Sequence, residues 1–432
     1  MKHSPNAHSH ITACCLLLAS AGLALAQTDP GPRSGGPPLS GQPLRGLQPN
    51  ESQLFNQGRN TFTEVDGVSA GLGPRFNLDS CAGCHAQPAP GGTSPAINPE
   101  IAAALKNGAL NHIPAFIQQN GPVLAVRFRQ NANGTPDGSV HNLWVITGRS
   151  DAPAACSITQ PDFSNANNLS FRIPSPTFGL GLIEAIPDSA LRANLAANAA
   201  QKTALGIAGQ FNLSGNDGTI TRFGWKAQNK SLLMFSGEAY NVEIGVTNEL
   251  FPNEREDNPA CATNTTPEDQ PGPNGAPSDI EAFSAFMRFL APPGPPQPNP
   301  NTAASVANGK ALFSSTGCAL CHTPTLVSGN AASPALRNQT VNLYSDLAIH
   351  HMGQTLNDGI TQGIAQGDEW RSAPLWGLGD RLFLLHDGRT RDLVQAIELH
   401  DSPGSEAHAT ILNYQALTAS QKQDLLNFLR SL

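Results

Sequence analysis

Two short segments with one shared pattern constrain this chain more than any other feature. Residues 81–85 are CAGCH, and residues 318–322 are CALCH. Two thiols three positions apart, followed at once by a histidine, are the attachment signature of a c-type haem. The sulfurs bond to the haem vinyl groups and the histidine becomes the proximal iron ligand.

A zinc site is the alternative for each segment, but it would need further Cys or His residues nearby to complete a tetrahedral set. Neither segment has a second Cys pair close to it. The sequence therefore predicts two covalently bound haems c. The attachment residues would be Cys81, Cys84, Cys318 and Cys321, with His85 and His322 as the proximal iron ligands.

The N-terminal residues have the pattern of an export signal. Lys2 supplies a positive start, residues 11–25 are apolar and small, and residues 24–26 form a plausible cleavage site. The apolar run is short for a membrane span. A lipoprotein anchor at Cys14 or Cys15 is the alternative. We expect a cleaved signal peptide at 1–26 and a periplasmic protein without a membrane span, which suits covalent haem attachment.

Two cysteines, Cys156 and Cys261, lie outside the signal and the haem segments. An oxidising compartment allows them to form a disulfide. Two buried free thiols are the alternative.

Composition narrows the class of protein. A chain of 432 residues is long enough for two or three domains. Only 13% of its residues are charged, while Gly and Pro number 41 and 36, which indicates long ordered loops over a modest scaffold. The formal net charge of −8 argues against nucleic-acid binding and is compatible with a basic redox partner.

The chain divides into five predicted segments, and the fold class is mainly α. After the signal, residues 27–49 are a flexible lead-in rich in Pro, Gly and Ser. Residues 50–290 form an N-terminal c-type haem domain, enlarged by long loops and small β elements. A Pro-rich linker at 291–303 precedes a C-terminal cytochrome c domain at 304–432.

Several secondary-structure elements are predicted within these domains. Helices are expected at 54–62, 186–208, 279–290, 305–313 and 418–432, the last with capping-box spacing at Thr418 and Gln421. Residues 124–129 and 140–147 flank a turn-rich stretch and predict a β-hairpin, and 219–223 predict a short strand.

Long strings of the sequence are those of a known family. They are residues 71–95, 172–187, 217–250, 286–293, 317–324, 344–353 and 369–400. On these strings the chain resembles the bacterial di-haem oxidoreductases, peroxidase-type or thiol oxidoreductases related to the di-haem cytochrome c peroxidases. The resemblance implies that the C-terminal haem transfers electrons and that the N-terminal haem meets hydrogen peroxide.

The resemblance also implies a distal ligand for the C-terminal haem. In the related peroxidases this ligand, commonly methionine, follows a His-Asp-Gly motif by fourteen positions. Here the motif is residues 386–388, so His400 takes the ligand's place. A second imidazole would lower the haem potential relative to methionine. His350, His351 and Met352 are alternative ligands, and His386 is expected to be structural.

For the N-terminal haem, His112 and His141 are the candidate distal ligands by proximity in the sequence. A peroxidase also needs an acid–base group above the iron, and relatives use glutamate. Glu184, Glu238 and Glu243 lie in uncharged surroundings. We predict Glu184 as the catalytic residue, against the alternative of a structural pair with an arginine.

Two further features of the relatives concern the region between the haems. Trp225 is a candidate electron relay, with core packing as the alternative. Relatives also bind calcium between the haems, but Arg381 stands where their threonine is expected, which argues against a calcium site.

The resemblance thus implies a periplasmic enzyme that reduces hydrogen peroxide with electrons from a small cytochrome c or cupredoxin. An oxygen-activating di-haem oxygenase or oxidase, and a pure di-haem electron carrier, are the alternatives. A free coordination position on the iron of the N-terminal haem would indicate an enzyme, whereas an iron with six ligands would indicate a carrier.

Overall fold

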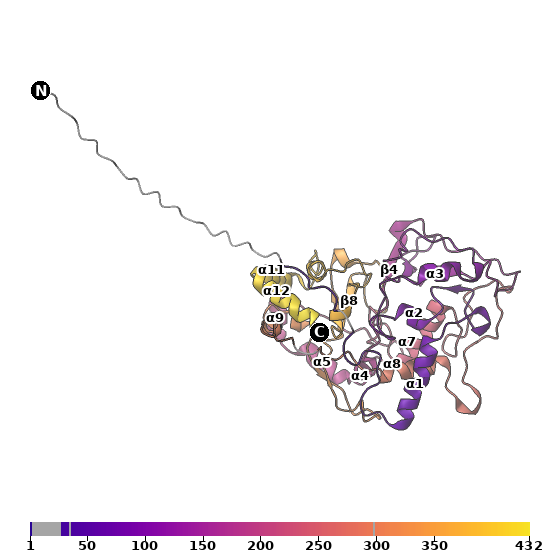
Figure 1. The fold of residues 1–432 in the computed structure, drawn as a ribbon, viewed down its shortest axis with the longest axis horizontal. Coiled ribbons are helices and arrows are strands. Elements are labelled where there is room, and N and C mark those ends of the chain that lie inside the picture. The colour runs from indigo at the N-terminus through magenta and orange to yellow at the C-terminus, as the bar shows by residue number, and fades with distance from the viewer. Residues whose placement is uncertain (2–26, 34–35, 297–298) are drawn as a thin grey trace.

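The computed structural model describes residues 1, 27–33, 36–296 and 299–432, and the fold is mainly helical with a few small strands (Figure 1). Residues 2–26 of the predicted signal peptide, 34–35 of the predicted lead-in and 297–298 of the predicted linker lie outside the described residues. Within these ranges no helix has the length and apolarity that a membrane crossing requires.

One pair of helices supports the first haem segment. Helix α1 (Pro49–Thr63) packs on α8 (Asp279–Phe289). Gly58 permits a close crossing, because a Cβ atom there would lie 2.1 Å from the carbonyl oxygen of Ala282. Four residues later, Phe62 packs on Phe286 with ring centroids 4.8 Å apart. Phe62 also contacts His85, with a centroid distance of 6.0 Å, so the pair is joined to the segment in α2 (Cys81–Cys84).

A second pair repeats this arrangement on the other side of the molecule (Figure 1). Helix α9 (Ala303–Ser315) packs on α12 (Ala419–Arg430). A Cβ atom at Gly309 would lie 2.0 Å from the carbonyl oxygen of Asp424. Four residues later, Phe313 packs on Phe428 at 5.4 Å and on His322 at 6.4 Å. Both haem segments therefore sit against a pair of helices that cross at a glycine.

The remaining helices connect these pairs and cover them. They are η1 (Val68–Ala70), α3 (Glu100–Leu105), η2 (Lys106–Gly108), η3 (Ala166–Asn168), α4 (Leu180–Glu184), α5 (Asp188–Ala196), α6 (Ala199–Leu205), α7 (Leu232–Ala239), η4 (Tyr240–Ile244), η5 (Pro273–Gly275), η6 (Cys318–Leu320), η7 (Gln354–Leu356), η8 (Leu378–Asp380), α10 (Leu393–Glu398) and α11 (His408–Gln415).

The described strands form four two-stranded antiparallel sheets. The pairs are β1 (Arg75–Phe76) with β3 (Trp144–Val145), β2 (Ala125–Phe128) with β4 (Leu169–Arg172), β5 (Leu326–Val327) with β6 (Thr340–Val341), and β7 (Ile349–His351) with β8 (Glu369–Arg371). The predicted hairpin of 124–129 with 140–147 is confirmed only in part: the His141 amide donates to the Val126 carbonyl at 2.8 Å, but the strand ladders of the two stretches lie elsewhere. Its two stretches take distant partners, and an isolated bridge between Arg127 and Val140 joins them. Burial of side chains such as Val126 and Trp144 in the core outweighed proximity in the sequence.

Four of the five predicted helices are confirmed as α1, α8, α9 and α12, and Thr418 and Gln421 form the predicted capping box. The helix predicted at 186–208 is instead α5 and α6, because Asn198 between them has a left-handed backbone with φ of 57°. The strand predicted at 219–223 is reduced to isolated bridges.

The N-terminal lead-in differs from the flexible stretch that its composition predicts. Asp29 accepts a hydrogen bond from Arg430 Nη2 at 2.6 Å, and Arg33 forms an ion pair with Asp380. Farther along, the Leu44 amide donates to the Phe289 carbonyl at 2.8 Å. The lead-in therefore contacts both helix pairs.

Two main clusters of buried apolar side chains form the core. The smaller cluster surrounds α9 and α12, and the larger one is built mostly from residues 55–290. The larger cluster also contains Leu343 and Phe383. Apolar contacts thus cross the predicted linker, and the domain limits stay a prediction. Cys156 and Cys261 are bonded to each other, which confirms the disulfide.

Candidate functional site

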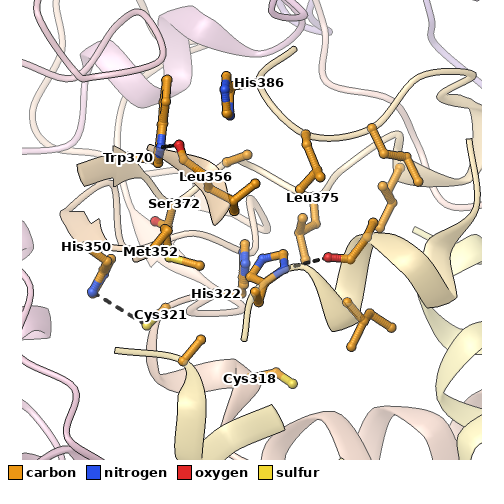
Figure 2. Close-up of a pocket in the computed structure, with 18 of the residues that line it drawn as sticks. Cys318, Cys321, His322, His350, Met352, Leu356, Trp370, Ser372, Leu375 and His386 are labelled. Carbon is orange, nitrogen blue, oxygen red and sulfur yellow. Dashed lines mark hydrogen bonds between the residues drawn. The ribbon is translucent and has the colours of Figure 1, made fainter. Parts of the chain in front are cut away.

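The two haem segments line two separate cavities. Cys81, Cys84 and His85 line one, which we call the His85 cavity. The equivalent residues of the second segment line the other, which we call the His322 cavity (Figure 2). None of the four segment cysteines forms a disulfide.

Both segment histidines are prepared to bind a metal through Nε2. The Nδ1 atom of His85 donates to the carbonyl of Gly92 at 3.0 Å, and Nδ1 of His322 donates to the carbonyl of Tyr344 at 3.1 Å. Burial lowers the pKa of both rings, that of His322 to about 4, with the nearby His400 as the second cause. A neutral ring that donates through Nδ1 keeps the Nε2 lone pair for a metal.

Buried arginines test whether the His322 cavity fits a haem. Arg371 and Arg381 both line it. Burial lowers the pKa of each to about 10, and the charge of Arg381 contributes to the effect on Arg371. Within the described ranges, Nη1 of Arg371 has no hydrogen-bond partner. Two adjacent buried cations of this kind require anions, and the two propionates of a haem would supply them.

The His85 cavity has a matching pair of arginines. Arg127 and Arg172 both line it, and the Nε atom of each lacks a hydrogen-bond partner among the described residues. Burial lowers the pKa of Arg172 to about 10, and the charge of Arg127 is the second cause. The donor sets of both cavities therefore fit a haem with its propionates.

The structure brings His400 to the His322 cavity. Its Nδ1 atom donates to the carbonyl of Ala396 at 2.7 Å, and burial lowers its pKa. Nε2 of His400 is therefore available to a metal in the same way as Nε2 of His322, and both residues line the same cavity. Ligation by His400 stays a prediction, and its position is compatible with that role.

The three alternative ligands differ in whether they line the cavity and whether they have a free donor atom. His350 lines the same cavity, but its Nδ1 bonds Glu406 at 2.8 Å and its Nε2 bonds Asp346 at 3.0 Å, so neither nitrogen is free for a metal. His351 pairs with Asp368 at 3.0 Å and does not line the cavity. Met352 does line it and keeps its place as an alternative (Figure 2).

His386 also lines the His322 cavity and stacks on Trp370, with ring centroids 3.8 Å apart (Figure 2). Burial lowers its pKa to about 4, so the ring is neutral. These contacts suit the structural role that the sequence predicts for it.

Neither histidine predicted for the N-terminal haem lines the His85 cavity. His141 stacks on Phe128 at 3.8 Å and bonds Asp137 at 2.8 Å. His112 is exposed, and its backbone bonds the Gln160 side chain. Proximity in the sequence does not bring either ring to this cavity, because His141 is held against β2 and His112 lies in an exposed loop beside Gln160.

Glu184 does not line the His85 cavity either. Its carboxylate accepts from Arg288 Nε at 2.7 Å and from the Leu232 amide at 2.9 Å. The alternative of a structural arginine pair therefore describes Glu184 better than a catalytic role. Glu238 bonds Asn229 and also lies outside the cavity lining.

Glu243 is the predicted glutamate that does reach the cavity. It lies in the π-helix η4, which continues α7, and short π-helical segments occur often at functional sites. Its Oε2 accepts from Asn77 Nδ2 at 2.6 Å, and burial raises its pKa.

A second carboxyl, Glu100, lines the same cavity and was not predicted. It is fully buried and accepts hydrogen bonds from Asn98 Nδ2 at 2.9 Å and from the Leu124 amide at 3.1 Å. Burial raises its pKa to about 8, and Glu243 contributes to this rise. No pattern in the sequence marks Glu100, since its burial depends on segments that fold over α3.

A family model described as "Di-haem oxidoreductase, putative peroxidase" matches residues 146–432, which is most of the chain. The chain belongs to the di-haem oxidoreductase family. The matched range includes the second haem segment and begins after the first. A search among curated proteins found no match.

Solved structures similar to this di-haem oxidoreductase include the diheme peroxidase BthA from Burkholderia thailandensis, with 14% identity, coverage of 89% of this chain and 86% of that one, and a TM-score of 0.41. Hydrazine synthase of Kuenenia stuttgartiensis has 15% identity, full coverage of both chains and a TM-score of 0.34. A MauG-like protein associated with microbial copper homeostasis has 16% identity, coverage of 60% and 89%, and a TM-score of 0.28. The TM-scores are low, so these likenesses say little about the site.

Trp225 of this di-haem oxidoreductase lines both cavities. Its indole Nε1 donates to the carbonyl of Ile173 at 2.8 Å, and Ile173 lines both cavities as well. For calcium, the described ranges contain no group of three or more His, Cys, Asp or Glu placed to hold a metal ion.

Proposed function

We propose that this di-haem oxidoreductase carries two covalent haems c and reduces hydrogen peroxide in the His85 cavity. Electrons would enter at the His322 cavity. The observation that carries the proposal is the inequality of the two cavities. The His322 cavity is lined by a second imidazole, that of His400, whereas the His85 cavity is lined by the carboxyls of Glu100 and Glu243.

The repeated helix pairs support two cytochrome c-like units. Each unit places a glycine crossing and a phenylalanine against its haem segment, around Gly58 and Phe62 in one case and Gly309 and Phe313 in the other. A unit with ligands from both sides, as His322 and His400 would provide, is suited to electron transfer.

The overall reaction consumes one peroxide, two electrons and two protons and releases two water molecules. A haem in the His85 cavity would supply the iron that binds peroxide and would pass on the electrons. Glu243 would take the proton from the peroxide oxygen nearer the iron and return it to the far oxygen, which then leaves as water. Its raised pKa suits a group that must both accept and donate a proton near neutral pH.

Trp225 would connect the two centres, because it is part of the lining of both cavities. The electron donor would be a small, basic cytochrome c or cupredoxin, which the net charge of −8 would attract. The export signal supports a periplasmic location.

The first experiment is a spectrum of the oxidised protein, followed by rapid mixing with peroxide. One haem should be low-spin and one should bind peroxide, and turnover should continue with a reduced donor. Glu243→Gln should slow the peroxide step by about 10²- to 10⁴-fold. Glu184→Gln is the matched control, since that carboxylate pairs with Arg288 outside the cavity, and it should leave the step unchanged.

Two outcomes would contradict the proposal. Two low-spin haems that refuse external ligands even after half-reduction would indicate an electron carrier. Slow reaction with peroxide, combined with oxygen consumption in the presence of a reductant, would indicate an oxygen-activating enzyme.

A further inference from the structure

A buried lysine lies beside the residue that joins the two cavities. Lys226 follows Trp225 directly, and its side chain is fully buried. The two residues are the central pair of a tight turn, closed by a hydrogen bond from the Ala227 amide to the Gly224 carbonyl at 3.2 Å. Ala227 has a left-handed backbone with φ of 50°, which costs about 1 kcal/mol or more in a residue with a Cβ atom. Other contacts must therefore hold this turn in place.

The ammonium of Lys226 occupies a complete cation site. It donates to the carbonyls of Gln366 at 2.7 Å, Glu369 at 3.0 Å and Gly367 at 3.1 Å. The carboxylate of Asp358 lies 3.3 Å away and supplies the negative charge. We call these three carbonyls and this carboxylate the cation cage.

The cage touches the walls of both cavities. On one side, Asp358 also pairs with Arg172 at 2.8 Å, and Arg172 lines the His85 cavity. On the other side, Nζ of Lys226 lies 4.0 Å from the ring centroid of Trp370, which lines the His322 cavity. The charges that act on the ammonium are those of Asp358, Arg172 and, more weakly, Asp368. Lys226, Asp358 and Arg172 are buried together.

The segment that supplies the cage carbonyls also holds the backbone of Trp225. This segment continues into β8, and Arg371 of β8 donates two hydrogen bonds to the turn. The Arg371 amide bonds the Trp225 carbonyl at 3.0 Å, and Arg371 Nε bonds the Gly224 carbonyl at 2.9 Å. Hydrogen bonds therefore join the turn and segment 366–371 in both senses: Lys226 donates to the segment, and Arg371 of the segment donates to the turn.

We propose that Lys226 is a positioning residue, and that its ammonium, held in the cation cage, keeps Trp225 between the two cavities so that electrons can pass from one to the other. The proposal rests on the two haems of the proposed function but not on peroxide as the substrate. Removing the charge would take the lysine donor from three carbonyls and leave the buried Asp358 carboxylate with Arg172 as its remaining cation. The segment would rearrange to compensate for the lost hydrogen bonds. Trp225 would then lose its defined place.

The test measures electron exchange between the haems of the complete, haem-loaded protein after flash reduction, without peroxide. Lys226→Met keeps the length of the side chain and removes the charge, and exchange should slow by about tenfold or more, as expected when residues in one network are coupled. Lys202→Met is the matched control. Lys202 is also buried and donates to the backbone carbonyls of Asn194 and Leu195, at 3.1 and 2.8 Å, and none of these three residues lines either cavity. Exchange should keep its original rate in that variant.

A double-mutant cycle separates positioning from general damage. If Lys226 acts through Trp225, Lys226→Met should cause no further loss in a protein that already carries Trp225→Phe. A further loss of similar size would overturn the proposal. So would exchange at the original rate in Lys226→Met, or an equal slowing in Lys202→Met.

Chemical rescue covers the case in which Lys226→Met does not fold. Lys226→Ala removes the fragment propylammonium, which should bind the empty cage, raise the Tm of that variant and restore exchange. Propanol has the same length without the charge and should do neither, and Lys202→Ala should not respond. If propylammonium leaves Tm and exchange unchanged, the cage does not need a cation and the inference fails. A protein that exchanges electrons as expected but ignores peroxide would refute only the proposed function.

Discussion

Glu100→Gln should remove a large pH dependence from the stability of the protein. Glu100 is fully buried in the wall of the His85 cavity. Its hydrogen-bond donors, Asn98 and the Leu124 amide, are neutral. Burial raises its pKa from 4.5 to about 8, and the nearby Glu243 contributes to this rise. The neutral acid is therefore the form that the fold favours.

The sign of the effect follows from linkage. Because the folded-state pKa lies above the unfolded one, the stability that the neutral carboxyl contributes is complete below pH 4.5. It is lost as the pH rises through about 8. The interval between these values, at about 1.4 kcal/mol per pH unit, corresponds to about 5 kcal/mol at most. Glutamine has a similar shape and does not titrate. The Glu100→Gln variant should therefore lose none of this free energy of unfolding as the pH rises.

The assay is urea unfolding of the haem-loaded protein at a series of pH values from 4.5 to 9. The free energy of unfolding of Glu100→Gln, minus that of the original protein, should rise with pH and level off above about 8. Glu398→Gln, at an exposed position of α10, is the control and should give a flat difference. A flat difference for Glu100→Gln as well would refute the reasoning, since Glu100 would then be ionised in the fold at no cost.

Three further predictions concern the haem segments, His400 and the disulfide. His400→Ala should convert one haem to high spin and let it bind cyanide, as an absorption spectrum would show, while the other haem keeps its behaviour. Replacing Cys81 and Cys84 with alanine should leave one covalent haem by mass, and retention of two would refute that assignment. Replacing Cys156 and Cys261 with serine should lower the free energy of unfolding by about 5 kcal/mol, because the bond closes a loop of 105 residues. Equal unfolding midpoints in urea would contradict this.

The sequence predicted the local features of the site and failed on the distant ones. The haem segments are contiguous, so the prediction of His85 and His322 as iron ligands needs the pattern alone. Helix α12 could be placed from its capping box and apolar stripe. Glu184 and Glu243 could not be separated in this way, because both lie in uncharged stretches. The partner that removes Glu184 from consideration is Arg288, 104 residues away.

The repeat between the two halves was partly visible in the sequence. Each haem segment is preceded by a glycine and, four positions later, a phenylalanine, at 58 and 62 and at 309 and 313. Such a short pattern occurs often by chance, and its meaning depends on what the glycine crosses. The structure supplies that information, because a Cβ atom at either glycine would lie about 2 Å from a carbonyl oxygen of the facing helix.

The repeated frame and the unequal cavities together indicate where the chemistry of this protein is specified. Both halves offer the same crossing helices, the same phenylalanine against the histidine, and the same pair of buried arginines. The frame alone would therefore give two equivalent haem sites. The difference comes from segments added to it. In one half, α10 ends beside His400, and in the other, the π-helix η4 brings in Glu243. A substitution in the helix pair, phenylalanine or arginines of either half should therefore weaken haem binding in that half. A substitution in α10 or η4 should instead change the ligation or reactivity of one haem and leave its binding intact.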